Sequence, residues 1–220
     1  MIKGVIFDMD GLLVDSEPFW REAEIAAFAE VGLNLTHELC MQTIGLRIDE
    51  VVVKWYKEHP WENKTFKEVE DSIHDNFIQL IEKDAKPKEG VQYILEFFKA
   101  KDFKIGLASS SHLRIINAML KALDITNYFE VVHSAEKEEY GKPHPAVYIN
   151  AAKQLGVLPV DTVAFEDSFA GLVSAMAARM KTVSIPEKEF SHLSRFDVAD
   201  IRLNSLLDFK EEHFKMLMGK

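Results

Sequence analysis

Residues 3–11 constrain the fold more than any other stretch of the chain. Residues 5–7, Val-Ile-Phe, form a short apolar run, which predicts a strand buried on both faces. This run stops at Asp8 and Asp10, which are followed by Gly11. A buried carboxylate without a partner is costly, and ligands of parallel α/β sheets bind beyond the carboxyl ends of the strands. Asp8 and Asp10 are therefore candidate functional residues, with an ordinary surface turn as the alternative.

The next part of the chain is helical throughout. Apolar residues recur at helical spacing over residues 16–31, 36–43, 48–59 and 65–83, without a strand pattern between them. We therefore expect residues 16–86 to form a helical module inserted after the first strand, and residues 1–15 and 87–220 to form the core. The alternative is that these helices pack as part of a single domain.

Helix and strand patterns alternate from residue 90 onward. Strands are predicted at 103–108, 129–132, 162–165, 182–185 and 200–203, and helices include 145–155, 169–179 and 206–217. Repeated strand–helix units predict an α/β fold, with a parallel sheet that carries helices on both faces.

Composition excludes several classes of partner. The chain has 220 residues, a formal net charge of −10 and no basic stripe, so we expect no nucleic-acid partner. No apolar run approaches the ~18 residues of a membrane span, and the N-terminus enters the first strand without a secretory signal. Cys40 is the only cysteine, so no intrachain disulfide is possible. We expect a cytoplasmic monomer with no membrane contact.

Polar clusters also follow two later strands. Ser109, Ser110 and Ser111 follow the second strand, and Glu166 and Asp167 follow the fourth. The carboxyl ends of parallel strands lie along one edge, so these clusters can converge on Asp8 and Asp10. We expect Ser109 and Ser110 to open a helix whose free N–H groups bind an anion.

The chemistry of these clusters is complementary. Lys142, just before a predicted helix, would add positive charge. Asp8, Asp167 and Glu166 offer the hard oxygen ligands that Mg²⁺ prefers beside a substrate phosphate. Taken singly, each cluster has a plain explanation, namely helix capping, a surface lysine or a helix start. Their conjunction at successive strand ends favours a phosphate site.

At this point the sequence resembles the haloacid dehalogenase-like hydrolase superfamily, specifically its helical-cap, β-phosphoglucomutase-like subgroup. The residues that match its four motifs are Asp8-Met9-Asp10-Gly11, Ser109, Lys142-Pro143, and Glu166-Asp167-Ser168 with Gly171. The resemblance implies a Rossmann-like core with an inserted α-helical cap. It implies that Asp8 is a nucleophile forming an aspartyl-phosphate and that Asp10 is the general acid/base.

The resemblance also assigns ligands. Ser109, with Ser110 beside it, and Lys142 match the phosphate-binding positions. The Mg²⁺ ligands would be Asp8, the backbone carbonyl of Asp10, and Asp167, with Glu166 in the outer sphere.

Three cap residues are candidates for substrate specificity. Arg47 would grip a sugar hydroxyl or a second anion, and a solvated arginine at a helix start is the equal alternative. Glu17 and Trp20 lie near the hinge, and for Trp20 core packing is the stronger explanation. The mutases of the subgroup carry a histidine where this chain has Trp20. Arg179 replaces a glycine common in the family, at the far end of a predicted helix.

The stretches 15–18, 45–47 and 140–145 are most similar to hexose-phosphate phosphatases of the 2-deoxyglucose-6-phosphate type. The sequence therefore predicts a Mg²⁺-dependent phosphatase that acts on small phosphorylated sugars or polyols, with a small-molecule phosphate ester as its partner. The alternatives are a sugar phosphomutase and, less favoured because Asp8 and Asp10 are both present, a non-catalytic phosphosugar-binding protein.

Overall fold

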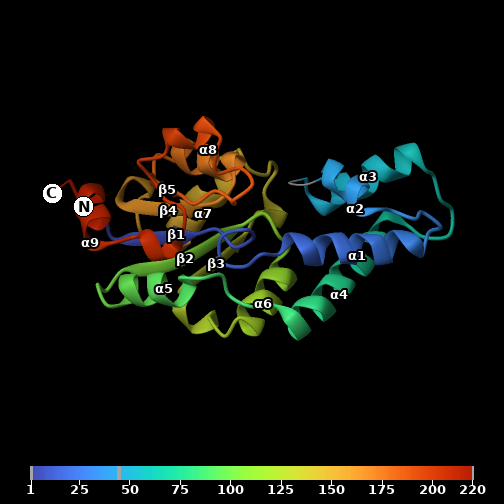
Figure 1. Cartoon of the computed structure of the whole chain (residues 1–220), viewed down its shortest axis with the longest axis horizontal. Helices are drawn as coiled ribbons and strands as arrows, with labels where there is room; N and C mark the ends of the chain where they lie inside the picture. The colour runs from blue at the N-terminus through green and yellow to red at the C-terminus, as the bar shows by residue number, and fades with distance from the viewer. Residues whose placement is uncertain (1, 44–45, 220) are drawn as a thin grey trace. The chain divides into compact units, whose positions relative to one another are not determined.

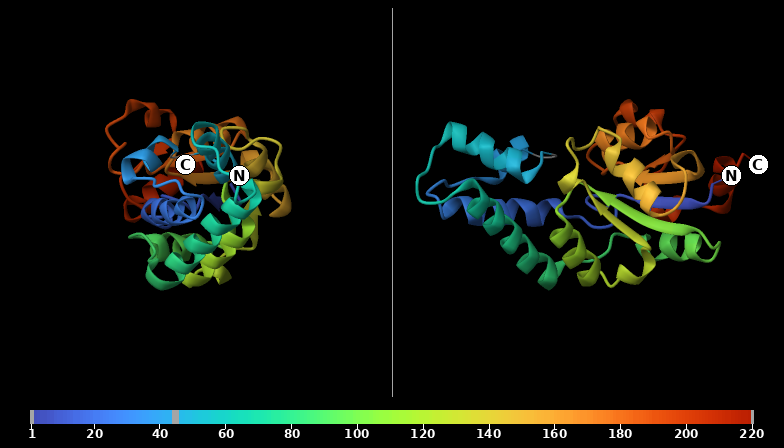
Figure 2. Two further views of the ribbon diagram at one scale, coloured as in Figure 1. Left: turned by 90° about the vertical axis from the view of Figure 1, so that its right-hand side faces the viewer. Right: turned by 180° about the vertical axis from the view of Figure 1, so that it is seen from behind.

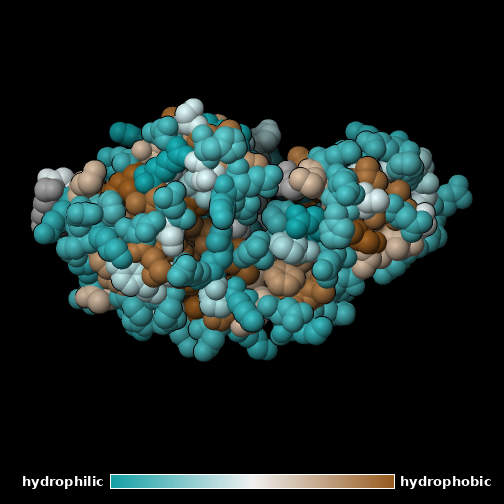
Figure 3. Space-filling model, viewed as in Figure 1, coloured by the Kyte–Doolittle hydropathy of each residue, from teal (hydrophilic) through white to brown (hydrophobic). Residues whose placement is uncertain are grey.

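The computed structural model describes residues 2–43 and 46–219. The chain forms two compact units, one made of Met1–Asp15 with Lys86–Lys220 and the other of Ser16–Ala85. Gly45, in the stretch that carries the predicted specificity residue Arg47, lies outside the described residues. In the part that is described, no helix combines the length and the apolar character needed to span a bilayer. Polar side chains cover most of the face seen in Figure 3.

The first unit is built on a parallel sheet (Figure 1). Its strands are β1 (Gly4–Phe7), β2 (Lys104–Ser109), β3 (Val131–Ser134), β4 (Thr162–Glu166), β5 (Lys181–Ser184) and β6 (Ile201–Arg202). The order across the sheet is β3-β2-β1-β4-β5-β6, so β1 is flanked by β2 and β4. In this register Val5 lies opposite Ile105 and Val163. The parallel sheet confirms the predicted α/β fold class.

Helices cover both faces of the sheet (Figures 1 and 2). They are α5 (Val91–Lys99) and α6 (Leu113–Ala122) on one face, and α7 (Ala146–Gln154) and α8 (Phe169–Ala177) on the other. Successive residues of β1 point to opposite faces. Ile6 belongs to the apolar cluster formed with α7 and α8, whereas the Phe7 ring centroid lies 6.1 Å from that of Phe98 in α5. Packing on both faces therefore fixes the strand that ends at Asp8.

Two elements differ from the sequence prediction. The third strand begins at Val131, not at residue 129, because a 3-10 turn, Thr126–Tyr128, comes before it. The helix predicted over 206–217 is broken into a 3-10 turn, Leu206–Asp208, and α9 (Glu211–Leu217). The break has a physical reason, because Phe209 is extended and its buried ring packs 5.6 Å from that of Phe98.

The second unit contains α1 (Glu17–Ala29), α2 (His37–Cys40), α3 (Ile48–Glu58) and α4 (Phe66–Asp84), with a 3-10 turn at Met41–Thr43. Apolar residues of α1 and α4 pack together, and the rings of Trp20 and Phe77 are stacked at 3.8 Å. Thr65 caps α4, since its hydroxyl accepts from the N–H of Glu68 and the Glu68 carboxylate accepts from the N–H of Thr65. A capped, amphipathic α4 explains why the sequence pattern placed this helix well.

Glu24 is a buried carboxyl group inside the helical unit. Its Oε2 accepts no hydrogen bond from the described residues. Its side chain is hydrogen-bonded to the Cys40 thiol. Burial, and then the negative charge of Glu17, raise the pKa of Glu24 to about 7. Burial and Glu24 in turn raise the pKa of Cys40 to about 12, against the opposing charge of Arg21.

We expect the stability of the helical unit to fall as the pH rises from 5 to 8. Glu24 stays neutral in the folded state up to about pH 7, but it ionises near pH 4.5 in the unfolded state. The free energy of unfolding therefore falls as the pH rises between these two values. The full effect is on the order of 3 kcal/mol. Urea unfolding at both pH values would measure it, and Glu24→Gln should reduce the pH dependence. An unchanged pH dependence in Glu24→Gln would contradict this account.

Arg179 follows α8 in a left-handed conformation, with φ of 66°. The N–H of Arg179 donates to the carbonyl of Met176 at 2.8 Å, and that of Met180 donates to Ala175 at 3.1 Å. This pattern is a Schellman motif, in which the position that Arg179 holds favours glycine.

Arg179→Gly should therefore stabilise the protein by about 0.5–1 kcal/mol, because glycine relieves the left-handed strain and only partly loses the gain to unfolded-state entropy. Thermal unfolding would measure the gain. Arg179→Ala keeps a Cβ and serves as the control, which should not be stabilised. Equal effects of glycine and alanine would contradict the assignment of strain.

Candidate active site

The predicted site residues of the core lie together at the carboxyl edge of the sheet. Asp8 follows β1, Ser109 ends β2 and Glu166 ends β4. These three strands are neighbours, and the N–H of Asp8 donates to the carbonyl of Phe165 on β4 at 3.0 Å. Asp8 and Glu166 are both buried. Adjacent parallel strands thus place two carboxylates side by side out of water.

Lys142 lies between these two carboxylates. Its Nζ is 2.7 Å from Asp8 Oδ1 and 2.6 Å from Glu166 Oε1, and it also donates to the carbonyl of Ala108 at 3.2 Å. The Lys142-Pro143 peptide bond is cis. The side chain is buried, and although burial alone would lower its pKa, the charges of Asp8 and Glu166 raise it. Lys142 is therefore a fixed positive charge, and not the surface lysine that was the alternative.

Asp8, Glu166 and Asp167 form a cluster that could hold a metal ion, because one oxygen from each lies within 4.8 Å of the others. Burial, together with the repulsion of Glu166 and Asp10, raises the pKa of Asp8 to about 7, against the opposing charge of Lys142. Burial and the charges of Asp8 and Glu166 raise the pKa of Asp167 well above its usual value. Crowded carboxylates of this kind are stabilised by a cation.

A specific oxygen in this cluster fits a cation ligand. Asp167 Oδ1 is buried and has no hydrogen-bond partner among the described residues. Gly11 makes room for this side chain, because a Cβ built at Gly11 would lie 2.1 Å from Asp167 Oδ2. Gly11 also has φ of +73°, which turns the chain back after Asp10. An unpartnered, hard oxygen beside Asp8 is the donor chemistry that Mg²⁺ requires.

Asp10 is held by the turn that follows β2. The hydroxyl of Ser111 donates to Asp10 Oδ2 at 2.8 Å, and that of Ser109 does so at 3.4 Å. Ser111 is itself fixed, because its N–H donates to Ser109 Oγ and its carbonyl accepts from Ser134 Oγ at 2.6 Å. These contacts orient one carboxylate oxygen of Asp10.

The prediction that Ser109 and Ser110 open a helix is wrong. Ser109 is the last residue of β2, and α6 begins only at Leu113 with His112 as its N-cap. The intervening turn leaves Ser110 exposed and Ser109 buried. The run of serines resembled a helix start because serine is a common cap, but the His112 ring accepts from the N–H of Arg114 and takes that position.

The specificity candidates all belong to the helical unit. Glu17 is in the first turn of α1, and Trp20 stacks on Phe77. Arg47 is the N-cap residue of α3, and its guanidinium donates to both carboxylate oxygens of Asp49, at 3.1 and 2.9 Å. Their role in substrate selection stays a prediction.

Two functional candidates were missed by sequence reasoning. Tyr148 is fully buried in α7 and donates to Glu166 Oε1 at 2.5 Å. Ser111, although noted as part of the serine run, was not singled out as the partner of Asp10. The signal for Tyr148 was weak, because a tyrosine on the apolar face of a helix is normally a core residue.

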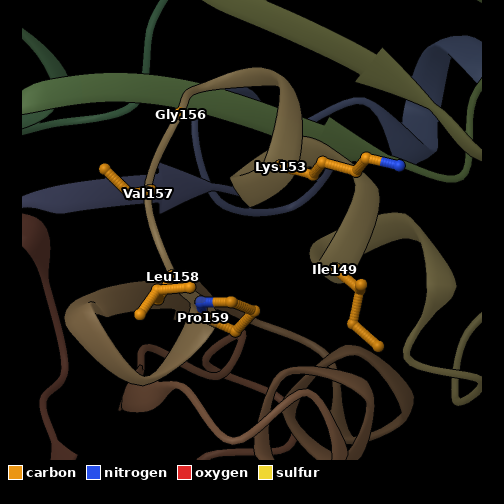
Figure 4. A pocket seen from close by; sticks show the side chains of 6 residues that line it. All are labelled: Ile149, Lys153, Gly156, Val157, Leu158 and Pro159. Atoms are coloured by element: carbon orange, nitrogen blue, oxygen red, sulfur yellow. The ribbon is translucent and has the colours of Figure 1, made fainter.

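A hollow of about 300 Å³ lies elsewhere in the core unit. Its lining residues come from α7 and the loop after it, as Figure 4 shows: Ile149, Lys153, Gly156, Val157, Leu158 and Pro159. This loop leads into the amino end of β4, so the hollow lies at the edge opposite to the carboxylates. It contains none of the predicted site residues.

Comparison with known proteins defines the family. The model of the haloacid dehalogenase-like hydrolase family matches residues 5–185. Hexitol phosphatase B of Escherichia coli K12 is 39% identical over 94% of both chains. A phosphorylated carbohydrates phosphatase of Thermotoga maritima is 31% identical over 83% of this chain and 84% of its own. The chain therefore belongs to the haloacid dehalogenase-like hydrolase family, as its motifs predicted.

Solved structures show a similar fold. The crystal structure of CbbY from Rhodobacter sphaeroides in complex with phosphate has a TM-score of 0.86 at 22% identity, and covers 94% of this chain and 96% of its own. A β-phosphoglucomutase from Clostridium difficile has a TM-score of 0.83 at 24% identity, and covers 100% and 98%. At these identities the structures show the shared fold. The family and the phosphatases among its relatives confirm that the chain is a phosphatase enzyme.

Gly171 in α8 provides a test of how tightly the site is built. A Cβ added there would lie 1.9 Å from Glu166 Oε1, so alanine would displace the carboxylate that faces Lys142. Gly171→Ala should lower stability by about 1–3 kcal/mol, although alanine normally favours a helix. Thermal unfolding would measure this loss. A stabilised variant would show that the Glu166 carboxylate can move freely.

Proposed function

We propose that the protein is a Mg²⁺-dependent phosphatase of small phosphorylated sugars or polyols, which works through an aspartyl-phosphate. The observation that carries this proposal is the position of Lys142, whose ammonium contacts both Asp8 and Glu166 next to an unpartnered oxygen of Asp167. A phosphate dianion approaching Asp8 needs positive charge at that point. The site thus supports a carboxylate nucleophile attacking a phosphoryl group.

In the first step, a carboxylate oxygen of Asp8 attacks phosphorus, and the bond from phosphorus to the substrate oxygen breaks. Asp10, as a neutral acid, gives its proton to the leaving alcohol. In the second step, Asp10 takes a proton from water as the water attacks the phosphoryl group, and the Asp8 carboxylate is released with inorganic phosphate. The hydroxyl of Ser111 keeps Asp10 in place for both transfers.

Three groups would bind the phosphoryl oxygens. They are Lys142, the hydroxyl of Ser109 and the exposed Ser110 in the turn after β2. Asp8, the backbone carbonyl of Asp10, and Asp167 would hold Mg²⁺, with Glu166 in the outer sphere against Lys142. The metal ion would neutralise charge on Asp8 and on the phosphoryl oxygens.

The relatives named as a hexitol phosphatase and a phosphorylated carbohydrates phosphatase support a hexitol or hexose phosphate as the substrate. One residue disfavours a mutase. Trp20 stands where the mutases of the subgroup carry a histidine, and its ring is stacked on Phe77 in the helical unit. The likeness to a β-phosphoglucomutase structure concerns the fold.

The proposal predicts phosphate release from hexitol and hexose phosphates that requires Mg²⁺ and stops with a chelator. Asp8→Asn should lower the rate at least about 1,000-fold because the nucleophile is lost, and Asp10→Asn about 100-fold or more because proton transfer is lost. A colorimetric phosphate assay over a panel of phosphorylated sugars, polyols and phosphoglycolate would measure both. Asp208→Asn, at an exposed position, is the matched control and should act like the wild type.

The same assay separates the alternatives. A phosphatase that uses Asp8 is ruled out if Asp8→Asn keeps most of the activity. Isomerisation of a hexose 1-phosphate that depends on a bisphosphate activator, without net phosphate release, would identify a mutase. Tight binding of sugar phosphates with no turnover in Mg²⁺ would identify a binding protein.

A further inference from the structure

Tyr148 contacts the charged centre of the site from inside the core. Its side chain is fully buried in α7, and its hydroxyl donates to Glu166 Oε1 at 2.5 Å. The same oxygen of Glu166 accepts from Lys142 Nζ at 2.6 Å, and the Tyr148 hydroxyl lies 3.4 Å from that Nζ. Tyr148 and Lys142 therefore share one carboxylate oxygen.

The Glu166 carboxylate is fixed on its other side as well. Glu166 Oε2 accepts from the N–H and the hydroxyl of Ser168, at 3.4 and 3.2 Å. Gly171 leaves no room beyond it, since a Cβ there would lie 2.2 Å from Oε2. Glu166 therefore cannot rotate to compensate for the loss of a donor at Oε1.

Lys142 Nζ donates to Asp8, Glu166 and the carbonyl of Ala108, and its contact with the Tyr148 hydroxyl is the longest of the four. Its attraction to each carboxylate depends on how far the charge of that carboxylate is already satisfied by other donors. The phenol satisfies part of the charge on Glu166 Oε1, which leaves more of the lysine charge for Asp8 and for an incoming phosphate. A carboxylate without this donor would draw the ammonium toward itself.

We propose that Tyr148 is a positioning residue, which acts through Glu166 to keep the Lys142 ammonium directed at Asp8 and at the substrate phosphoryl group. This inference rests on the proposed function for the identity of the substrate group. Among the described residues, the hydrogen bonds of the Tyr148 hydroxyl are to Glu166 and Lys142, and not to Asp8 or Asp10.

Tyr148→Phe tests the role, because it removes the hydroxyl and keeps the buried ring, a swap that cores tolerate well. Calorimetric titration of the Mg²⁺-loaded protein with inorganic phosphate should show a dissociation constant raised about 10- to 20-fold, the lower end of what a lost hydrogen bond to a charged group causes. The stoichiometry should not change. A purely structural role would instead lower the fraction of binding-competent protein and leave the dissociation constant as it was.

Tyr93→Phe is the matched control. The Tyr93 hydroxyl donates to the carbonyl of Phe209 at 2.8 Å, and no contact recorded for it involves a site residue. Its loss should leave phosphate affinity within about twofold of the wild type. With sugar phosphates as substrates, Tyr148→Phe should lower kcat about tenfold and also raise KM, since the displaced lysine is misaligned for the phosphoryl group of the substrate as it is for inorganic phosphate.

The route through Glu166 is tested in a Glu166→Gln background. There the carboxylate charge is gone, so adding Tyr148→Phe should change phosphate affinity by less than about twofold. Wild-type affinity in Tyr148→Phe, or the same loss in both backgrounds, would overturn the inference, and so would a wild type that binds no phosphate. Phosphate binding needs no turnover, so a wild type that binds phosphate but hydrolyses no ester would refute the proposed function and still decide the role of Tyr148.

Discussion

The structure of the site depends on the ion pairs of one buried lysine. Lys142 contacts Asp8 and Glu166 in a region closed to water, where either carboxylate alone would be strongly disfavoured. This arrangement needs space as well as charge. Gly171 provides the space by letting the Glu166 carboxylate lie against α8, and Gly11 does the same for Asp167. Two glycines in the motifs are thus required by the approach of side chains to the backbone, and only Gly11 has a positive φ.

The sheet fixes the geometry from which this charge cluster is built. Asp8 has little freedom, because the preceding residues Ile6 and Phe7 are buried on opposite faces and the strand is hydrogen-bonded on both sides. Glu166 ends a neighbouring strand and is fixed in the same way. Lys142, in contrast, comes from a loop before α7 and reaches the cluster with a long side chain. Rigid strands position the two carboxylates, and the long side chain of Lys142 supplies the positive charge between them.

Much of this was predictable from sequence, for a physical reason. Parallel strands end at one edge, so polar residues after apolar runs must converge there, and Asp8, Ser109 and Glu166 do so. The predictions that failed depended on contacts that the sequence pattern does not encode. The turn after Ser109 delays α6 until Leu113, and Phe209 breaks the last helix because its ring is buried in the core. The role of Tyr148 is invisible in the sequence, since only the structure aims its hydroxyl at Glu166.

The excess of negative charge among the site residues favours the binding of a cation. The site has one ammonium, that of Lys142, against the three clustered carboxylates of Asp8, Glu166 and Asp167. Asp10 lies close by. A phosphate ester entering this edge would meet more negative than positive charge, and Asp167 Oδ1 has no donor within the described residues. Burial strengthens that repulsion because the local dielectric is low. A divalent cation at Asp8 and Asp167 would reverse the balance, so a site of this composition favours a metal ion for binding the ester as much as for the reaction.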